Sequence, residues 1–272
     1  MDTLTFFSLF TYGFVKRALV TGVFFSFTCA LLGVFLLLRK EAMIGHGLSH
    51  IAFGGVAVAL FLGLAPLPVT LAVAAIAALI ILGVRERAGL YGDTIIGILS
   101  SLGMAGGIIL ASISRHFNVD LFGYLFGNIL AISRLEMGTA VALSLLSLAL
   151  IVLFYYELIY ATFDEDCARV AGISVRRLDA VLAVLTAATV VVGMRVVGLL
   201  LVSALLVVPA ATGLLLGKSF FRAIGIAVAT SFIAVLCGLI LAFWFDWPAS
   251  GTIVLFSGIL FGLAYLLKRL KD

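Results

Sequence analysis

The stretch ALVTGVFFSFTCALLGVFLLL at residues 18–38 carries no charged side chain and is followed directly by Arg39 and Lys40. A helix that crosses the hydrocarbon core of a bilayer needs about 20 apolar residues, so this run is long enough to span. The rest of the chain has the same character, because 64% of its 272 residues are hydrophobic and only 11% are charged. Soluble domains carry about 25% charged residues. The composition therefore predicts an all-α polytopic membrane protein.

Eight further apolar runs follow, and together they predict about eight or nine transmembrane helices in a single transmembrane domain over residues 1–272. The count depends on the connection at 194–197, where Arg195 is the one strongly polar residue. The segment VDLFGYLFGNILAIS (119–133) is shorter and contains glycine, so we expect it to be interfacial or re-entrant. The runs lie near 14–38, 44–64, 67–84, 94–114, 136–157, 178–194, 197–217, 222–244 and 251–267.

The distribution of basic residues predicts the orientation in the membrane. With nine spans and the N-terminus outside, 12 of the 17 Lys and Arg residues fall on the cytoplasmic side. Because cytoplasmic loops carry an excess of Lys and Arg, we expect the N-terminus outside and the C-terminus in the cytoplasm. The net charge of +4 gives no indication of nucleic-acid binding.

Two of the three histidines lie in the motif IGHGLSH at 44–50. His46 and His50 are four residues apart and therefore share one face of a helix. Two imidazoles on one face can bind the same divalent cation, and polar residues inside a membrane often mark a transport pathway. Hydrogen bonding to neighbouring helices is the simpler alternative. The spacing favours a metal path through His46 and His50.

Asp246 is a second candidate ligand, in the segment FWFDWPASGTIVLF between the last two apolar runs. Pro248 and Gly251 interrupt the helix there, so the carboxylate is expected at the outer end of a helix, near a mouth of the pathway. The alternative is that Asp246 caps the final span. The sequence does not decide between these two roles.

The longest polar interruption is YATFDEDCARVAGISVRRLDAV at 160–181. Its acidic residues suit a helix N-terminus, and Gly172 breaks the pattern before Arg176 and Arg177. This order predicts a short helix, a turn and a second helix on the cytoplasmic face, at about 160–178. Such an ordered element has the form of a docking surface, whereas a solvated loop is the simpler alternative.

Two segments of the sequence match a known enzyme motif incompletely. A zinc protease needs a glutamate directly after the first histidine of H-E-x-x-H, but Gly47 occupies that position. The segment TGLLLGKS (212–219) resembles a phosphate-binding loop, but Thr212 replaces the first glycine and the segment continues an apolar run. We therefore expect neither metalloprotease chemistry nor ATP hydrolysis by this chain itself.

Six segments in order resemble the membrane permease subunits of bacterial ABC importers for zinc and manganese. The resemblance covers nearly the whole chain and implies a fold similar to that of the permeases of cobalamin and siderophore importers. The segments are GHGLSHIAFGGVA (45–57), DTIIGILSS (93–101), VDLFGYLFGNILAIS (119–133), DEDCARVAGI (164–173), SALLVVPAAT (203–212) and DWPASGTIVL (246–255).

This resemblance implies a transport subunit of a bacterial plasma (inner) membrane that is not itself an enzyme. It implies a homodimer or a pair of related permeases, two separate ATP-binding cassette ATPase subunits that hydrolyse ATP, and an extracytoplasmic metal-binding protein. It implies alternating access driven by ATP, with zinc or manganese as the transported ion and no permanently bound cofactor. The element that docks on the ATPase would be built from Asp164, Asp166, Ala168, Arg169 and Gly172.

The metal preference follows from one departure from the family pattern. The family usually has Asp where this chain has His46, and imidazole suits zinc whereas carboxylate suits manganese. The pair His46 and His50 therefore tilts the expectation toward zinc, with manganese and iron(II) left open. Asp246 matches the family's outer aspartate, although Ala242, one turn earlier, supplies no second ligand.

Two other transporters remain as alternatives. A proton-coupled secondary metal carrier would show several carboxylates within its spans, and these are nearly absent here. An ABC permease for a metal chelate would need a wide apolar pathway without paired ligands, and the pair His46 and His50 argues against it.

Overall fold

The computed structural model describes residues 13–88, 92–113 and 132–270, and in these ranges the chain is helical without strands. Nine of the described helices are long and apolar enough to cross a membrane. The predicted segment 119–133 lies outside the described residues except for Ile132 and Ser133. The nine helices are α2 (Gly13–Leu38), α3 (Ile44–Phe61), α4 (Pro66–Ala88), α5 (Gly92–Ile113), α7 (Arg134–Leu153), α10 (Val175–Val196), α11 (Leu199–Leu216), α12 (Phe220–Phe245) and α13 (Ala249–Arg269).

The described helices confirm the all-α membrane fold, and within the described residues nine of them are long and apolar enough to span, which is the higher of the two expected counts. The connection at 194–197 is a true break, because α10 ends at Val196 and α11 begins at Leu199. Gly198 between them has φ +92°, which is accessible to glycine at little cost. The run expected at 136–157 ends earlier, because α7 stops at Leu153 and a separate short helix follows.

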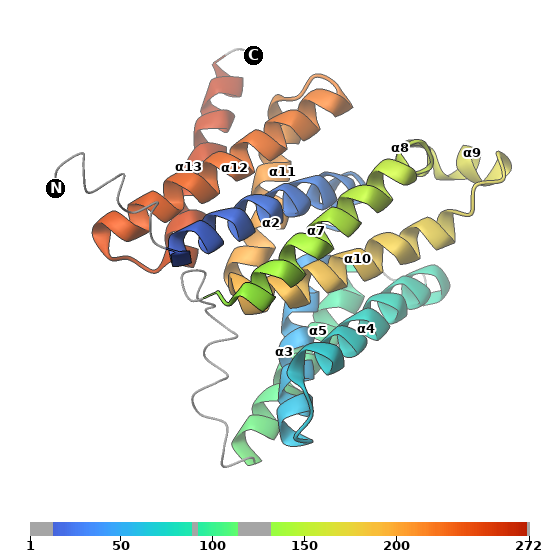
Figure 1. Ribbon diagram of the computed structural model, residues 1–272. Helices are drawn as coiled ribbons and strands as arrows, with labels where there is room; N and C mark the ends of the chain where they lie inside the picture. The colour runs from blue at the N-terminus through green and yellow to red at the C-terminus, as the bar shows by residue number, and fades with distance from the viewer. Residues whose placement is uncertain (1–12, 89–91, 114–131, 271–272) are drawn as a thin grey trace.

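The helices form a bundle (Figure 1). The share of buried residues is highest in α2, α3 and α10 and lowest in α4, α5, α7 and α13. Lipid is as apolar as leucine, so outward leucines on these helices need no protein cover. α3 packs on α4 and α5, α11 packs on α2, α12 and α13, and α10 packs on α4. The contacts thus form two groups, α3 with α4 and α5, and α11 with α2, α12 and α13, and α10 contacts members of both groups.

α3 and α5 approach closely because glycines line their contact. A side chain on Gly54 would meet the carbonyl oxygen of Gly103 at 2.5 Å, and one on Gly103 would meet the Cα of Ile51 at 2.8 Å. Small residues at such positions let two backbones pack directly. Of the glycines near His46 and His50, Gly47 and Gly54 therefore serve the packing of α3 against α5. Gly45 faces Leu206 of α11, and Gly55 faces Thr70 of α4.

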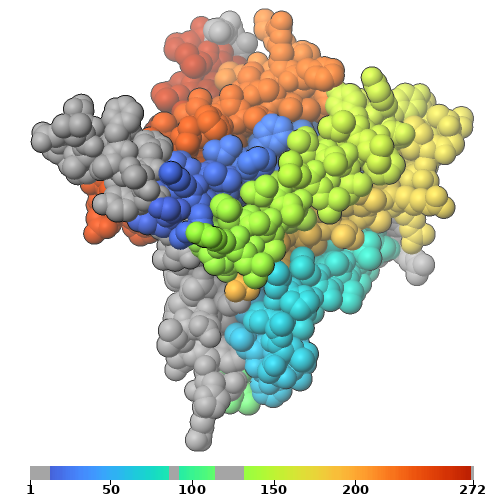
Figure 2. All heavy atoms as spheres, viewed as in Figure 1, coloured from blue at the N-terminus to red at the C-terminus, as the bar shows by residue number. Residues whose placement is uncertain are grey.

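Two short helices stand between α7 and α10. They are α8 (Tyr155–Phe163) and α9 (Glu165–Val170), and they project from the edge of the molecule (Figures 1 and 2). We call the end of the bundle that carries α8, α9 and the turn between α2 and α3 the Arg39 end. We call the opposite end, with the turn between α12 and α13, the Asp246 end.

Candidate functional site

His46 and His50 lie on the first two turns of α3, near the Arg39 end. The Nε2 atoms of the two imidazoles are 3.1 Å apart, and the ring centroids are 4.6 Å apart with an interplanar angle of 84°. His46 is exposed and His50 is half-buried. The Nδ1 atom of His50 is buried and accepts or donates no hydrogen bond among the described residues. The two Nε2 atoms are therefore within hydrogen-bond distance of each other.

This geometry fits two ligands of one cation. Two nitrogens bound to a tetrahedral zinc at 2.0–2.1 Å would be about 3.3 Å apart, close to the separation of 3.1 Å between the two Nε2 atoms. Within the described residues, no third His, Cys, Asp or Glu joins them in a metal-binding group. The pair can therefore supply two nitrogen donors from one chain.

Asp246 does not join this pair. It is exposed and ends α12 in a left-handed conformation with φ +53°, while Pro248 occupies the N-cap position of α13. α12 begins at the Arg39 end, where the rings of Phe35 and Phe220 are 5.6 Å apart, and its 26 residues extend about 39 Å at 1.5 Å per residue. Asp246 therefore lies at the opposite end of the bundle from the histidines.

The short helix α9 contains the predicted docking residues. Asp164 is its N-cap and accepts a hydrogen bond from the backbone N–H of Cys167 at 2.9 Å, and Ala168 is fully buried. Hydrogen bonds to Cys167 hold the pKa of Asp164 below its ordinary value. Asp166 and Arg169 are exposed, as is Val170, whose side chain is 91% exposed. α9 therefore has a single buried anchor and an otherwise open surface.

Gly172 ends α9 through backbone geometry. Its φ is +84°, its N–H donates to the carbonyl of Arg169, and the N–H of Ile173 donates to the carbonyl of Ala168, each at 3.0 Å. These two bonds form a Schellman motif, which requires a left-handed residue and favours glycine. α10 then begins at Val175, so the element consists of a short helix, a turn and a long helix.

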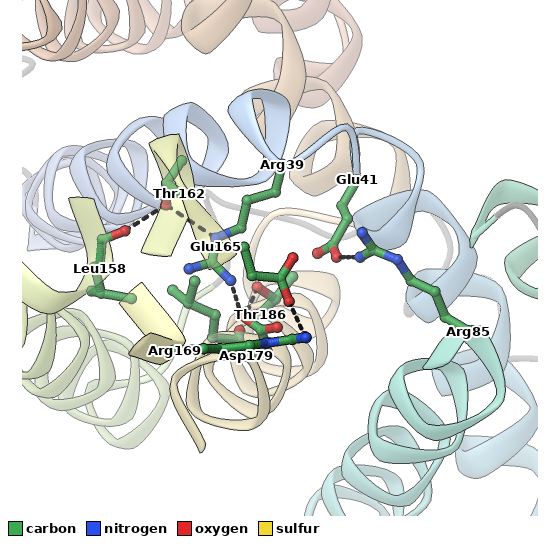
Figure 3. Close-up of polar contacts among 10 residues, drawn as sticks. Arg39, Glu41, Arg85, Leu158, Thr162, Glu165, Arg169, Asp179 and Thr186 are labelled. Carbon is green, nitrogen blue, oxygen red and sulfur yellow. Dashed lines mark hydrogen bonds and ion pairs between the residues drawn. The ribbon is translucent and has the colours of Figure 1, made fainter. Parts of the chain in front are cut away.

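Charged residues that the sequence did not single out join this element to the start of α3 (Figure 3). Arg39 pairs with Asp179 of α10, and its Nε donates to Thr162 Oγ1 of α8 at 3.1 Å. Glu41 pairs with Arg85 of α4. Burial raises the pKa of Glu41 above its ordinary value, against the opposing effect of Arg85. The one signal in the sequence was an acidic residue, Asp179, at the start of the apolar run 178–194.

A family model with the description "ABC 3 transport family" matches residues 11–268. The chain is 33% identical over 267 residues to the manganese transport system membrane protein MntC of Halalkalibacterium halodurans, covering 97% of this chain and 91% of that protein. It is 32% identical over 252 residues to the high-affinity zinc uptake system membrane protein ZnuB of Haemophilus influenzae, covering 93% and 96%.

A solved structure of PsaBC from Streptococcus pneumoniae in complex with Fab has a chain that superposes on this one with a TM-score of 0.86. The two are 31% identical, and the match covers 97% of this chain and 95% of that chain. The sequence match, the nine apolar helices and the superposition agree over nearly the full length. The chain is thus a multi-pass membrane protein that belongs to the ABC 3 transport family.

Proposed function

We propose that this chain is the permease subunit of an ATP-driven importer of divalent metal ions, with zinc favoured over manganese. The ion would cross by alternating access and would be cargo rather than a resident cofactor. The observation that carries the proposal is the convergence of the His46 and His50 Nε2 atoms to 3.1 Å on the face of a membrane helix. Family membership supports the transport class.

The preference for zinc depends on the chemistry of the pair. Imidazole nitrogens suit zinc, and carboxylates suit manganese. The similar proteins include one named for manganese and one named for zinc, so their names do not decide between the metals. Zinc takes four ligands in its common geometry, and His46 and His50 from two copies of the chain would supply four nitrogens. This arrangement supports a homodimer with the ion on the axis between the copies.

The remaining partners follow from the transport class. ATP would be hydrolysed by two ATP-binding cassette subunits, and an extracytoplasmic metal-binding protein would deliver the ion to the Asp246 end. The exposed surface of α9, with Arg169 and Val170 outward, supports its role as the docking element. The count of basic residues supports placing the Arg39 end in the cytoplasm and the N-terminus outside.

Metal uptake by cells that express the whole transporter tests the site. His50→Ala should lower zinc uptake by about 10–100-fold or more. Substituting residues that only support the ligands of a metal site already costs about 10–100-fold. His46→Asp should retain uptake and raise the ratio of manganese to zinc transported. Ser49→Ala is the matched control, because the Ser49 hydroxyl is buried on the same helix and donates to the carbonyl of Gly45 at 2.8 Å.

Membrane insertion and co-purification of the ATPase are measured for every variant. Zinc uptake by His50→Ala at the level of Ser49→Ala would contradict the role of the pair. An unchanged metal ratio in His46→Asp would contradict the zinc preference while leaving the transport function intact.

A further inference from the structure

The turn between α2 and α3 is short and conformationally demanding. α2 ends at Leu38, and α3 begins at Ile44. Lys40 has φ +60°, its N–H donates to the carbonyl of Leu37, and the N–H of Glu41 donates to the carbonyl of Leu36. This is a Schellman motif with lysine where glycine is usual. The turn therefore holds a backbone conformation that its sequence does not favour locally.

Contacts on both sides of Lys40 hold this turn in place. On one side Arg39 reaches Asp179 and Thr162, and the side chains of Arg39 and Asp179 are only 10% and 19% exposed. On the other side Glu41 reaches Arg85 of α4. Breaking a buried ion pair leaves an uncompensated charge and is strongly unfavourable. The position of the turn is therefore set by α8, α10 and α4 more than by its own residues.

A charged residue of the docking element, Glu165, also affects the charges of Arg39 and Glu41. Glu165, the first residue of α9, forms an ion pair with Arg169, and Figure 3 shows Glu165 beside Arg39 and Glu41. Its charge contributes to the electrostatic environment of both Arg39 and Glu41. A shift of α8 and α9 would consequently change the distances from Thr162 and Glu165 to Arg39.

There is room beside the turn for such a shift. A cavity of about 410 Å³ is lined by both ion pairs, the first turn of α3 and the neighbouring faces of α4, α5 and α10. The Nη2 atom of Arg39 is buried and makes no hydrogen bond among the described residues. Close-packed interiors resist rearrangement, so a cavity at this point lowers the cost of moving the turn.

The turn leads directly into the helix of the histidines. The N–H of Ile44 donates to the carbonyl of Glu41, and the N–H of Gly47 donates to the carbonyl of Met43. His46 is two residues beyond Ile44, so a displacement of the turn carries the start of α3 and its first imidazole with it.

We propose that Arg39 is a positioning residue that transmits movement of α8, α9 and the start of α10, through its contacts with Thr162 and Asp179, to the His46 and His50 pair. The residue touches neither the ion nor ATP, and its role is to couple the two. The inference rests on the proposed function, since it assigns a route between the docking element and the metal path.

The test measures zinc transported per ATP hydrolysed, with the whole transporter reconstituted in liposomes. Asp179→Asn and Arg39→Gln should keep basal ATP hydrolysis and zinc binding but lower this ratio. Substitutions along a coupled network change coupling by amounts equivalent to about 2- to 30-fold. Thr162→Val, which removes only the bond to Arg39 Nε and a bond within α8, should give a smaller loss in the same direction.

Lys40→Gln is the matched control, because it neutralises the exposed neighbour of Arg39 and should leave the ratio unchanged. The double variant Arg39→Gln/Asp179→Asn should be no worse than the poorer single variant, because residues in one network are not additive. A structural role alone would lower insertion or assembly and leave the ratio of zinc to ATP unchanged.

The outcomes separate the two proposals. If the wild-type transporter moves no divalent ion, the proposed function fails. If it moves zinc and both Asp179→Asn and Thr162→Val keep the wild-type ratio, the coupling role of Arg39 is overturned and the proposed function stands. These two variants decide the question even if Arg39→Gln does not insert.

Discussion

At the scale of single residues, Cys167 and Asp164 form a local pair on α9. The thiol is exposed, and its hydrogen bond to the Asp164 carboxylate, together with the charge of that carboxylate, raises the pKa of Cys167. Thiolate is the reactive form of cysteine. At a given pH the raised pKa therefore leaves less thiolate, and Cys167 should react more slowly than an ordinary exposed cysteine.

Asp164→Asn should shift the pH profile of Cys167 alkylation to lower pH. Asparagine is as good an N-cap as aspartate, so α9 should persist while the negative charge is removed and the pKa of the thiol falls. The measurement is the maleimide labelling rate between about pH 7 and 10, around the ordinary thiol pKa near 8.5.

Asp166→Asn is the control for that experiment. Asp166 acts on Cys167 only through its charge and more weakly than Asp164, so its variant should show a smaller shift in the same direction. Equal profiles for Asp164→Asn and wild type would contradict the assigned hydrogen bond.

Residues close in sequence were predicted from spacing, and residues far apart were not. His46 and His50 share a helix face because four residues make about one turn, and the two Nε2 atoms are 3.1 Å apart. Arg39 and Asp179 are separated by 140 positions, and no periodicity relates them. Their pairing depends on how α2 and α10 meet at one end of the bundle, which is a property of the packed fold.

At the scale of helices, some glycines of α5 are in tight contact with α3 and others face open space, and substitutions can test this difference. Gly103→Ala should destabilise the protein by about 1–3 kcal/mol, the usual cost of overpacking, because its new Cβ would lie 2.8 Å from the Cα of Ile51. Gly97→Ala is the control on the same helix, since nothing lies within 4 Å of a Cβ there. Thermal unfolding in detergent should show a lower midpoint only for Gly103→Ala.

A second prediction concerns the end of α9. An L-residue in the left-handed conformation of Gly172 costs about 1–2 kcal/mol, and a β-branched side chain is the least tolerated there. Gly172→Val should therefore disturb α9 and lower the ATPase activity that the permease stimulates, while insertion is retained. Gly172→Asn should keep most of that activity, because asparagine enters this conformation more readily. Equal activity in both variants would contradict the docking role.

Helix breaks were predicted where the sequence carries a strong local signal. Gly172 marked the end of α9, and its positive φ accounts for that signal. The break at Phe154, between α7 and α8, contains no glycine or proline. The sequence therefore contains no signal for it, and the predicted run at 136–157 extends past the end of α7 at Leu153. After this break α8 packs at its far end against α12, where the ring centroids of Phe163 and Phe220 are 5.9 Å apart.

At the scale of the whole molecule, the composition was enough to predict the membrane fold, because each span is specified by its own apolar run. With nine spans, the sequence predicted Asp246 at the outer end of a helix and the two histidines just after a turn on the cytoplasmic side. The packed helices separate them to opposite ends, which is consistent with a path that the ion enters near Asp246 and leaves past His46. The direction of that path depends on the orientation in the membrane.

Cys167 tests this orientation directly. Of the three cysteines, Cys29 is buried in α2, Cys237 is half-buried in α12 and Cys167 is exposed on α9. A maleimide that cannot cross the membrane should label Cys167 in inverted vesicles and not in intact cells, because the positive-inside rule puts the Arg39 end in the cytoplasm. Cys167→Ser should abolish the signal.

Bound ATPase should protect Cys167 if α9 is the docking element. Labelling in intact cells would reverse the orientation and move both the docking element and the metal exit to the outside.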